Sequence, residues 1–189
     1  MRDQQWLFFK ATLTDPYVDE LIRHMEKTYT PIDASVGFKE EAKNKSDIRV
    51  SEVRWIDVNR EKTMSDMLWT YINRANRDSF DVDVRYLNEV QYTTYDGDKQ
   101  AHYDWHHDVD FKNNQPYHRK LSLTLQLSNP DEYEGGDFEF DGDIDQLPPE
   151  YKEKGTILIF PSFYRHRVSP VTQGTRKALV AWFEGPHWR

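Results

Sequence analysis

The second half of the chain is a succession of short segments with the composition of β-strands. They are rich in β-branched and aromatic residues, which favour strands. The segments are residues 80–87, 88–95, 102–109, 119–128, 136–140, 155–161 and 176–183. Turn-forming pairs such as Asp96-Gly97 and Gly135-Gly136 lie between them. Many short strands without alternating helices predict a mainly β fold with a double-stranded β-helix (jelly roll) core.

The first 80 residues contain two segments with helical periodicity. Asp15-Pro16 is a favourable helix start, and apolar residues recur at helical spacing as far as Tyr29. A second apolar stripe begins near Glu61 and runs to Ala75. We expect these N-terminal helices, two or three in number, to support the β core.

The stretch between the two helices is of mixed character. Residues 49–57 alternate as in a strand, whereas residues 31–47 are polar and irregular, as in a loop. We find no internal repeat and no composition shift typical of a linker. The sequence therefore predicts one domain over residues 1–189, with helical support over about 1–80 and the jelly-roll core over about 80–185.

Composition narrows the classes of function. The chain has no cysteine, which excludes disulfides, thiolate metal ligands and a cysteine nucleophile. The net charge of −8 argues against binding to a nucleic-acid backbone. No apolar segment is long enough to span a bilayer, and the N-terminal apolar run is too short for a signal peptide. We expect a soluble, cytoplasmic protein with no nucleic-acid or membrane partner.

Residues 103–108, Tyr-Asp-Trp-His-His-Asp, carry the strongest chemical signal. His106 and Asp108 are two apart in a predicted strand, so both side chains should leave the same face. A distant histidine, His166, would complete a set of two imidazoles and one carboxylate. That set leaves coordination positions open, as in non-haem Fe(II) oxygenases. Arg176, ten residues after His166, can clamp a carboxylate through two hydrogen bonds.

The metal ligands have an alternative register. His102 and Asp104 have the same spacing and the same strand parity as the later pair. Trp105, with Tyr103 two residues before it, favours His106 as the first ligand. A single histidine in a strand is more often structural than a metal ligand, so the prediction depends on the whole set.

Further segments follow this motif in a fixed order. They are Phe160-Pro161-Ser162-Phe163, residues 166–171, Gly174-Thr175-Arg176 and finally Trp182. Together with the segment 103–108, they resemble the Fe(II)- and 2-oxoglutarate-dependent dioxygenases, in their prolyl-4-hydroxylase-like branch. The resemblance covers about residues 90 to 184, roughly half of the chain.

The resemblance implies four catalytic residues. His106, Asp108 and His166 match the iron ligands of the family. Arg176 matches the basic residue that binds the far carboxylate of 2-oxoglutarate.

Four other residues match the family less closely. Tyr95, with Tyr92 as its competitor, matches a tyrosine that hydrogen-bonds 2-oxoglutarate. Trp182 matches a tryptophan that faces the substrate in prolyl hydroxylases, although a core role is its commoner alternative. Arg49 matches an arginine on a strand near the substrate.

The implied reaction is hydroxylation of a C–H bond, in first place of a prolyl or other amino-acid residue, with release of succinate and CO2. Its cofactors would be Fe(II), 2-oxoglutarate and O2, with ascorbate as an accessory reductant. A peptide, protein or amino-acid-like molecule would be the substrate. Whether the chain forms a homodimer is left open by the sequence.

Two other functions stay open. One is a non-enzymatic jelly-roll module that binds a metal or a small ligand. The other is the nucleic-acid demethylase branch of the same superfamily. That branch carries a second arginine six residues after the first, where this chain has Trp182.

Overall fold

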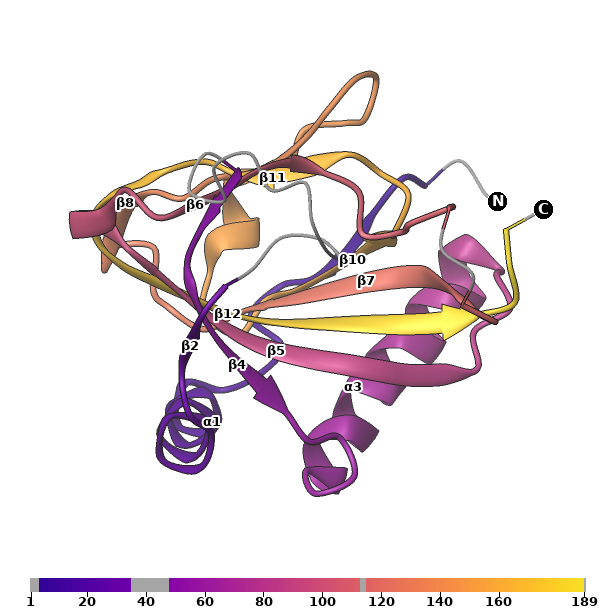
Figure 1. Cartoon of the computed structure of the whole chain (residues 1–189), viewed down its shortest axis with the longest axis horizontal. Helices are drawn as coiled ribbons and strands as arrows, with labels where there is room; N and C mark the ends of the chain where they lie inside the picture. The colour runs from indigo at the N-terminus through magenta and orange to yellow at the C-terminus, as the bar shows by residue number, and fades with distance from the viewer. Residues whose placement is uncertain (1–3, 35–47, 113–114, 189) are drawn as a thin grey trace.

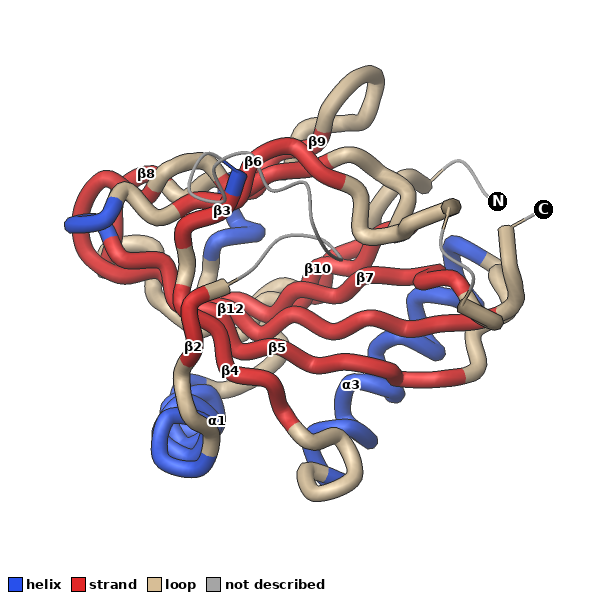
Figure 2. The backbone as a smooth tube through the Cα atoms, in the orientation of Figure 1, coloured by secondary structure: helices blue, strands red, loops and turns tan. Residues whose placement is uncertain are grey.

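The protein is described by a computed structural model that covers residues 4–34, 48–112 and 115–188. Two antiparallel β-sheets face each other, and the helices lie on the far side of the larger sheet (Figure 1). Figure 2 shows the same layers, with the smaller sheet above the larger one and the helices below it. The mainly β fold class with supporting N-terminal helices is confirmed.

The larger sheet holds eight strands of the described chain. Seven follow the order β1 (Leu7–Phe9), β10 (Ile157–Pro161), β7 (His118–Gln126), β12 (Val171–Gly185), β5 (Tyr86–Asp96), β4 (Glu52–Ile56) and β2 (Ile32–Asp33), and β8 (Tyr133–Gly135) pairs with β12 beside this path. The smaller sheet has the order β3 (Arg49–Val50), β6 (His102–His106), β11 (His166–Val168) and β9 (Phe138–Phe140). Short 3₁₀ turns lie at Gly97–Lys99 and Pro149–Lys152.

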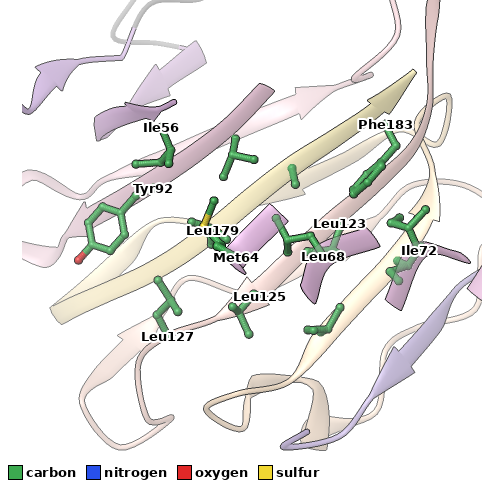
Figure 3. Packing of buried hydrophobic residues seen from close by; sticks show 14 of the residues in the cluster. Ile56, Met64, Leu68, Ile72, Tyr92, Leu123, Leu125, Leu127, Leu179 and Phe183 are labelled. Atoms are coloured by element: carbon green, nitrogen blue, oxygen red, sulfur yellow. The ribbon is translucent and has the colours of Figure 1, made fainter. Parts of the chain in front are cut away.

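Two helices cover the outer face of the larger sheet. They are α1 (Asp15–Thr28) and α3 (Lys62–Ala75), which a π-helical turn, Asn76–Phe80, prolongs. Their apolar stripes pack against the leucines and Phe183 of the central strands, as Figure 3 shows for α3. No helix in the described parts of the chain is long and apolar enough to cross a membrane.

The two faces of the larger sheet differ in chemistry. Along β7, Leu121, Leu123 and Leu125 belong to the core under the helices. The residues between them, among them Ser122 and Thr124, are also buried, but they point toward the smaller sheet. Buried polar side chains need hydrogen-bond partners, so the space between the two sheets is suited to binding a polar ligand.

The strand predicted for residues 80–87 is wrong over its first six residues. The chain leaves α3 through the π-helical turn, and Asp81 has a positive φ of 51°. Asn76 fixes this path, because its side chain both donates to the Val82 carbonyl and accepts from the Val82 N–H. Regular strand structure therefore begins only at Tyr86, and the two predicted strands 80–87 and 88–95 are the single strand β5.

Residues 49–57 form two strands rather than the single strand predicted. β3 belongs to the smaller sheet and β4 to the larger, so the chain changes sheets at Ser51. The pattern also missed several strands of only two or three residues, which are β1, β2, β8 and β11. The loop predicted for residues 31–47 falls mostly outside the described residues.

Candidate functional site

His106, Asp108 and His166 meet at one point between the two sheets. His106 on β6 lies directly opposite His166 on β11, and the possible ligand atoms of all three residues lie within 4.8 Å of one another. Asp108 Oδ1 is 3.5 Å from His106 Nε2, and Asp108 Oδ2 is 3.6 Å from His166 Nε2. Among the described residues this is the single group of such side chains that could hold a metal ion.

The alternative ligands lie elsewhere. The ring of His102 bonds through Nδ1 to the Gln100 carbonyl at 2.9 Å, and Asp104 is exposed on the same strand. Neither residue belongs to the group around Asp108. The geometry thus favours the later register that Trp105 pointed to.

Asp108 reaches the site by a different route from the one predicted. β6 ends at His106, so the argument that both side chains leave one strand face is wrong for Asp108. Asp108 lies in a bend beyond the strand, where its backbone N–H donates to the Ser162 carbonyl at 3.0 Å. This bond brings the bend against the chain that follows β10.

The tautomers of both histidines are fixed by backbone carbonyls. His106 Nδ1 lies 2.7 Å from the Asp104 carbonyl, and His166 Nδ1 lies 2.9 Å from the Tyr164 carbonyl. Because a carbonyl only accepts, each Nδ1 carries a proton, which leaves each Nε2, on the side of Asp108, as the ring nitrogen available to a metal. This is the arrangement that two metal-binding imidazoles require.

Aromatic rings hold both imidazoles in place. Tyr103 stacks on His106 with ring centroids 3.5 Å apart and planes 11° apart. Phe138 stacks on His166 at 5.1 Å and 19°. The ligand set is therefore ordered before any ion binds.

The charges at this point also suit a metal. Burial raises the pKa of the Asp108 carboxyl, but the neighbouring His166, His106 and Arg119 outweigh burial and hold that pKa far below its usual range. Burial lowers the pKa of His166 to about 4, although Asp108 opposes this shift. At neutral pH the site thus holds a carboxylate and a neutral His166, which are the protonation states that bind metal.

Ser122 completes the surroundings of Asp108. Its hydroxyl donates to Asp108 Oδ2 at 2.6 Å and also contacts the Ser162 hydroxyl at 2.9 Å. Such a bond orients a carboxylate ligand and leaves Oδ1 directed toward His106.

Arg176 is a buried cation in the wall of the same cavity. It is 1% exposed, and its guanidinium donates to Gln126 Oε1 at 3.0 Å and lies 5.4 Å from the centre of the Tyr95 ring. Among the described residues, neither its Nε nor the Nε2 of Gln126 has a hydrogen-bond partner, and no carboxylate forms an ion pair with Arg176. A buried charge without a counter-charge is costly. The wall therefore suits an anionic ligand.

The cavity is lined by a row of side chains from β12. Arg176, Ala178, Val180 and Trp182, which alternate along the strand, all face it. Trp182 is buried, yet its Nε1 has no hydrogen-bond partner in the part of the chain that the structure describes. It thus combines the two roles considered for it, a packed core residue and a cavity wall.

Arg119 lies across Trp182. Its guanidinium is 4.0 Å from the centre of the Trp182 ring, pairs with Glu89 and donates to the Asp108 carbonyl at 3.3 Å. The register of β12 is irregular against both neighbouring strands near Phe183. Such bulges can aim a side chain toward a site.

The structure separates the two tyrosines. Tyr95 lines the cavity beside Arg176. Tyr92 points to the opposite face of the sheet, where its hydroxyl donates to Glu26 of α1 at 2.7 Å. The suggestion that Tyr92 contacts the co-substrate is therefore dropped, because the sheet lies between its side chain and the cavity.

Arg49 lines the cavity from β3. Its guanidinium donates to Gln91 at 2.6 Å and to Ser51 at 2.9 Å, and it lies 4.4 Å from the centre of the Tyr103 ring. Because Tyr103 in turn stacks on His106, Arg49 supports a candidate metal ligand through the Tyr103 ring.

Several side chains of the site were not predicted from the sequence to be site residues. They are Tyr103, Ser122, Thr124, Gln126, Phe138 and Gln91. A signal existed for three of them, since β7 reads Leu-Ser-Leu-Thr-Leu-Gln and places every polar residue on one face.

Comparisons with known proteins agree with this geometry. The sequence pattern of the 2OG-Fe(II) oxygenase superfamily matches residues 90–184, half of the chain. A PKHD-type hydroxylase from Synechococcus sp. is 40% identical over 87 residues, 46% of this chain and 38% of that protein. One from Crocosphaera subtropica is 33% identical over 100 residues, 52% and 43% of the two chains. This chain spans less than half the length of these curated relatives.

Two solved structures show the same fold over nearly the whole chain. A viral collagen prolyl hydroxylase from Paramecium bursaria Chlorella virus-1, in complex with 2OG, has a TM-score of 0.71 at 20% identity and covers 97% of both chains. A prolyl hydroxylase from Trichoplax adhaerens, bound to a hypoxia inducible factor peptide fragment, has a TM-score of 0.73 at 16% identity and covers 96% and 84%. The predicted jelly-roll core is confirmed.

Proposed function

This chain belongs to the 2OG-Fe(II) oxygenase superfamily, and from that premise we propose that it is an Fe(II)- and 2-oxoglutarate-dependent hydroxylase acting on a prolyl or other amino-acid residue. The observation that carries the proposal is one cavity that contains two open imidazole nitrogens, a carboxylate and an unpaired buried arginine.

The iron ligands are His106, Asp108 and His166. The donor set is the two-histidine, one-carboxylate combination that leaves positions open for further ligands. A neutral His166 and an ionised Asp108 are already present at neutral pH, so these two ligands would release few protons when the ion binds. When bound, Fe(II) with 2-oxoglutarate and O2 supplies the oxidising power: one oxygen atom enters the substrate as a hydroxyl, the other enters succinate, and CO2 is released.

Arg176 binds the far carboxylate of 2-oxoglutarate. The unpaired Nε of Arg176 gains an acceptor, and the buried cation gains a counter-charge. Gln126 holds one guanidinium nitrogen, so the arginine keeps its orientation while the anion enters and leaves. Tyr95 packs beside the guanidinium and closes the wall of this part of the cavity.

The apolar wall excludes water from the reacting groups. Phe160, Val168 and Val180 line the cavity together with Trp182. In such surroundings the ion pair of Arg176 with an anion is stronger than in water. Ascorbate would act from solution, and nothing in the described residues is assigned to it.

A prolyl residue within a peptide is the substrate we favour. Two structural neighbours act as prolyl hydroxylases by their names, and one of them was solved with a peptide. The unpartnered indole N–H of Trp182 offers a hydrogen bond to a substrate carbonyl near the reaction centre. Arg49, on the opposite wall, is the second residue placed to contact the substrate.

Release of succinate tests the proposal. The protein is incubated with Fe(II), ascorbate, O2 and 2-oxoglutarate and with proline-containing peptides or free amino acids. Mass spectrometry then shows whether each product has gained one oxygen atom. His166→Ala should abolish succinate release. His102→Ala is the matched control, because His102 lies outside the ligand group, and it should leave the rate unchanged.

The outcomes separate the alternatives. Metal and 2-oxoglutarate binding with no succinate from any substrate would indicate a non-enzymatic binding module. Succinate release only with methylated nucleic acid would indicate a demethylase. Loss of activity in His102→Ala but not in His166→Ala would overturn the ligand assignment.

A further inference from the structure

Trp55 is a large aromatic side chain left exposed beside the cavity. It lies on β4, and 46% of its surface is accessible. Its ring centroid is 6.2 Å from that of Trp182, which lines the cavity. Trp55 thus continues the cavity wall outward onto the open part of the sheet.

The register of the strands places two further apolar residues on the same face. Trp55 lies opposite Gln91, which lines the cavity, so its side chain is on the cavity face of the larger sheet. Val53, two residues earlier on β4, shares this face and lies opposite Ile32 of β2. Ile32 is itself 51% exposed. Trp182, Trp55 and Ile32 form what we call the apolar ledge.

The ledge runs across the strands from the cavity to the edge of the sheet. Three strand spacings separate β12 from β2, which amounts to about 14 Å. An extended chain advances about 3.3 Å per residue, so about four residues cover that length. A free amino acid at the metal would not reach the outer part of the ledge.

Large exposed apolar side chains beside a cavity are typical of a binding surface. Flat aromatic rings favour extended proline-rich peptides, whose conformation costs little entropy to hold. The ledge is continuous with the cavity through Trp182. A peptide whose target residue lies at the metal must pass out of the cavity over one edge of it, and the ledge lies at such an edge.

We propose that the apolar ledge binds the substrate peptide beside its target residue, and that Trp55 determines specificity by packing against a proline or aliphatic side chain there. This rests on the proposed hydroxylase function. It makes the substrate a peptide or protein segment that extends about four residues from the hydroxylated position on one side, rather than a free amino acid.

A peptide series tests the ledge. Proline-containing peptides of increasing length are assayed with the full chain by succinate release, and KM is measured for each. The wild-type KM should fall as residues are added on one side of the target and then level off after about four. Trp55→Ala should raise KM about tenfold for the long peptides and little for the shortest. Trp55→Phe should restore most of the loss.

Tyr86→Ala is the matched control, because Tyr86 is equally exposed, at 47%, and lies outside the ledge. It should leave every KM unchanged. If the wild type hydroxylates peptides but Trp55→Ala shows the wild-type KM at all lengths, the ledge is not a substrate site. A wild-type KM that does not depend on length also overturns the proposal. A wild-type protein that releases no succinate and binds no 2-oxoglutarate would instead refute the proposed function.

Discussion

The two faces of the larger sheet use the same strands for opposite purposes. On the helix face, β7 and β12 present Leu123, Leu125, Leu179 and Phe183, which are fully buried against one another and the helices (Figure 3). On the cavity face, β7 presents Ser122, Thr124 and Gln126 and β12 presents Arg176, which are polar and also buried. Arg176 and Gln126 there leave hydrogen-bonding atoms unpartnered.

The difference separates stability from function. A leucine on the helix face has all its neighbours in the folded chain, so burial alone stabilises it. An unpartnered donor on the cavity face costs stability until a ligand supplies its acceptor. Variants on the two faces should therefore have opposite consequences, and five predictions test this.

The largest effect is expected at a metal ligand. His106→Ala removes one of three ligands, so iron affinity and succinate release should fall by about a thousandfold or more. The metal-free protein should keep its melting temperature within a few degrees. Calorimetry measures the iron affinity, and thermal unfolding measures the melting temperature. A variant that loses its fold rather than its iron affinity would contradict the proposed difference between the two faces.

Leu125→Ala tests the helix face. It removes a fully buried side chain, and the free energy of unfolding should fall by about 2–5 kcal/mol. Affinities for iron and 2-oxoglutarate, measured well below the melting temperature, should stay within twofold of wild type. Denaturant unfolding and binding titrations on the same preparation check this. A large loss of affinity would mean that the two faces are coupled.

Arg176→Met removes the buried cation from the cavity face. Affinity for 2-oxoglutarate should fall about a hundredfold, because the charge-assisted bonds are lost. The ligand-free protein should be as stable as wild type or more so, since an unpaired buried charge is replaced by an apolar chain. Lys177→Met is the control, because Lys177 pairs with Glu26 on the helix side. Marked destabilisation by Arg176→Met would contradict the account.

Lowering the pH should reduce the free energy of unfolding through His166 on the cavity side. The pKa of His166, which burial lowers to about 4, is below that of an unfolded histidine, near 6.5. The unfolded chain therefore binds the proton first, and the stability is fully present above about pH 6.5 and falls as the pH drops toward 4. We expect about 3 kcal/mol of loss in the metal-free protein. His166→Ala should flatten this slope, and an unchanged slope would contradict the assignment.

Ser122→Ala should have the smallest effect. The hydroxyl orients Asp108 but does not reach the metal, so iron affinity should fall about tenfold. Thr70→Ala on the exposed side of α3 is a control that should leave iron affinity unchanged. An effect of Ser122→Ala as large as that of His106→Ala would mean that the hydroxyl has a more direct role.

The sequence predicted the layers of the fold because alternation and turn residues are local signals. The segments that became β7, β10 and β12 are strongly periodic and lie where expected. It failed at residues 80–85, because the Asn76 side chain bonds to Val82 and prolongs the end of α3. Such a contact is invisible to periodicity.

The site was predictable in its residue types and less so in its geometry. The motif pointed to His106, Asp108 and His166 as a group. However, Asp108 lies beyond the end of the strand that was predicted to orient its side chain. Strand alternation could have decided between Tyr92 and Tyr95. Tyr92 shares a face with the apolar Val90, whereas Tyr95 shares a face with the polar Gln91 and Thr93. The stacking of Phe138 on His166 joins segments far apart in the sequence and left no local signal.

The most direct test of the account is binding of 2-oxoglutarate without oxygen. With Fe(II) present, the wild type should bind one equivalent and show the visible absorption of a metal–co-substrate complex. His166→Ala should lose that absorption together with iron, and Arg176→Met should keep iron but require about a hundredfold more 2-oxoglutarate. If the wild type binds Fe(II) and adding 2-oxoglutarate changes neither the heat nor the spectrum, the cavity face is not the co-substrate site.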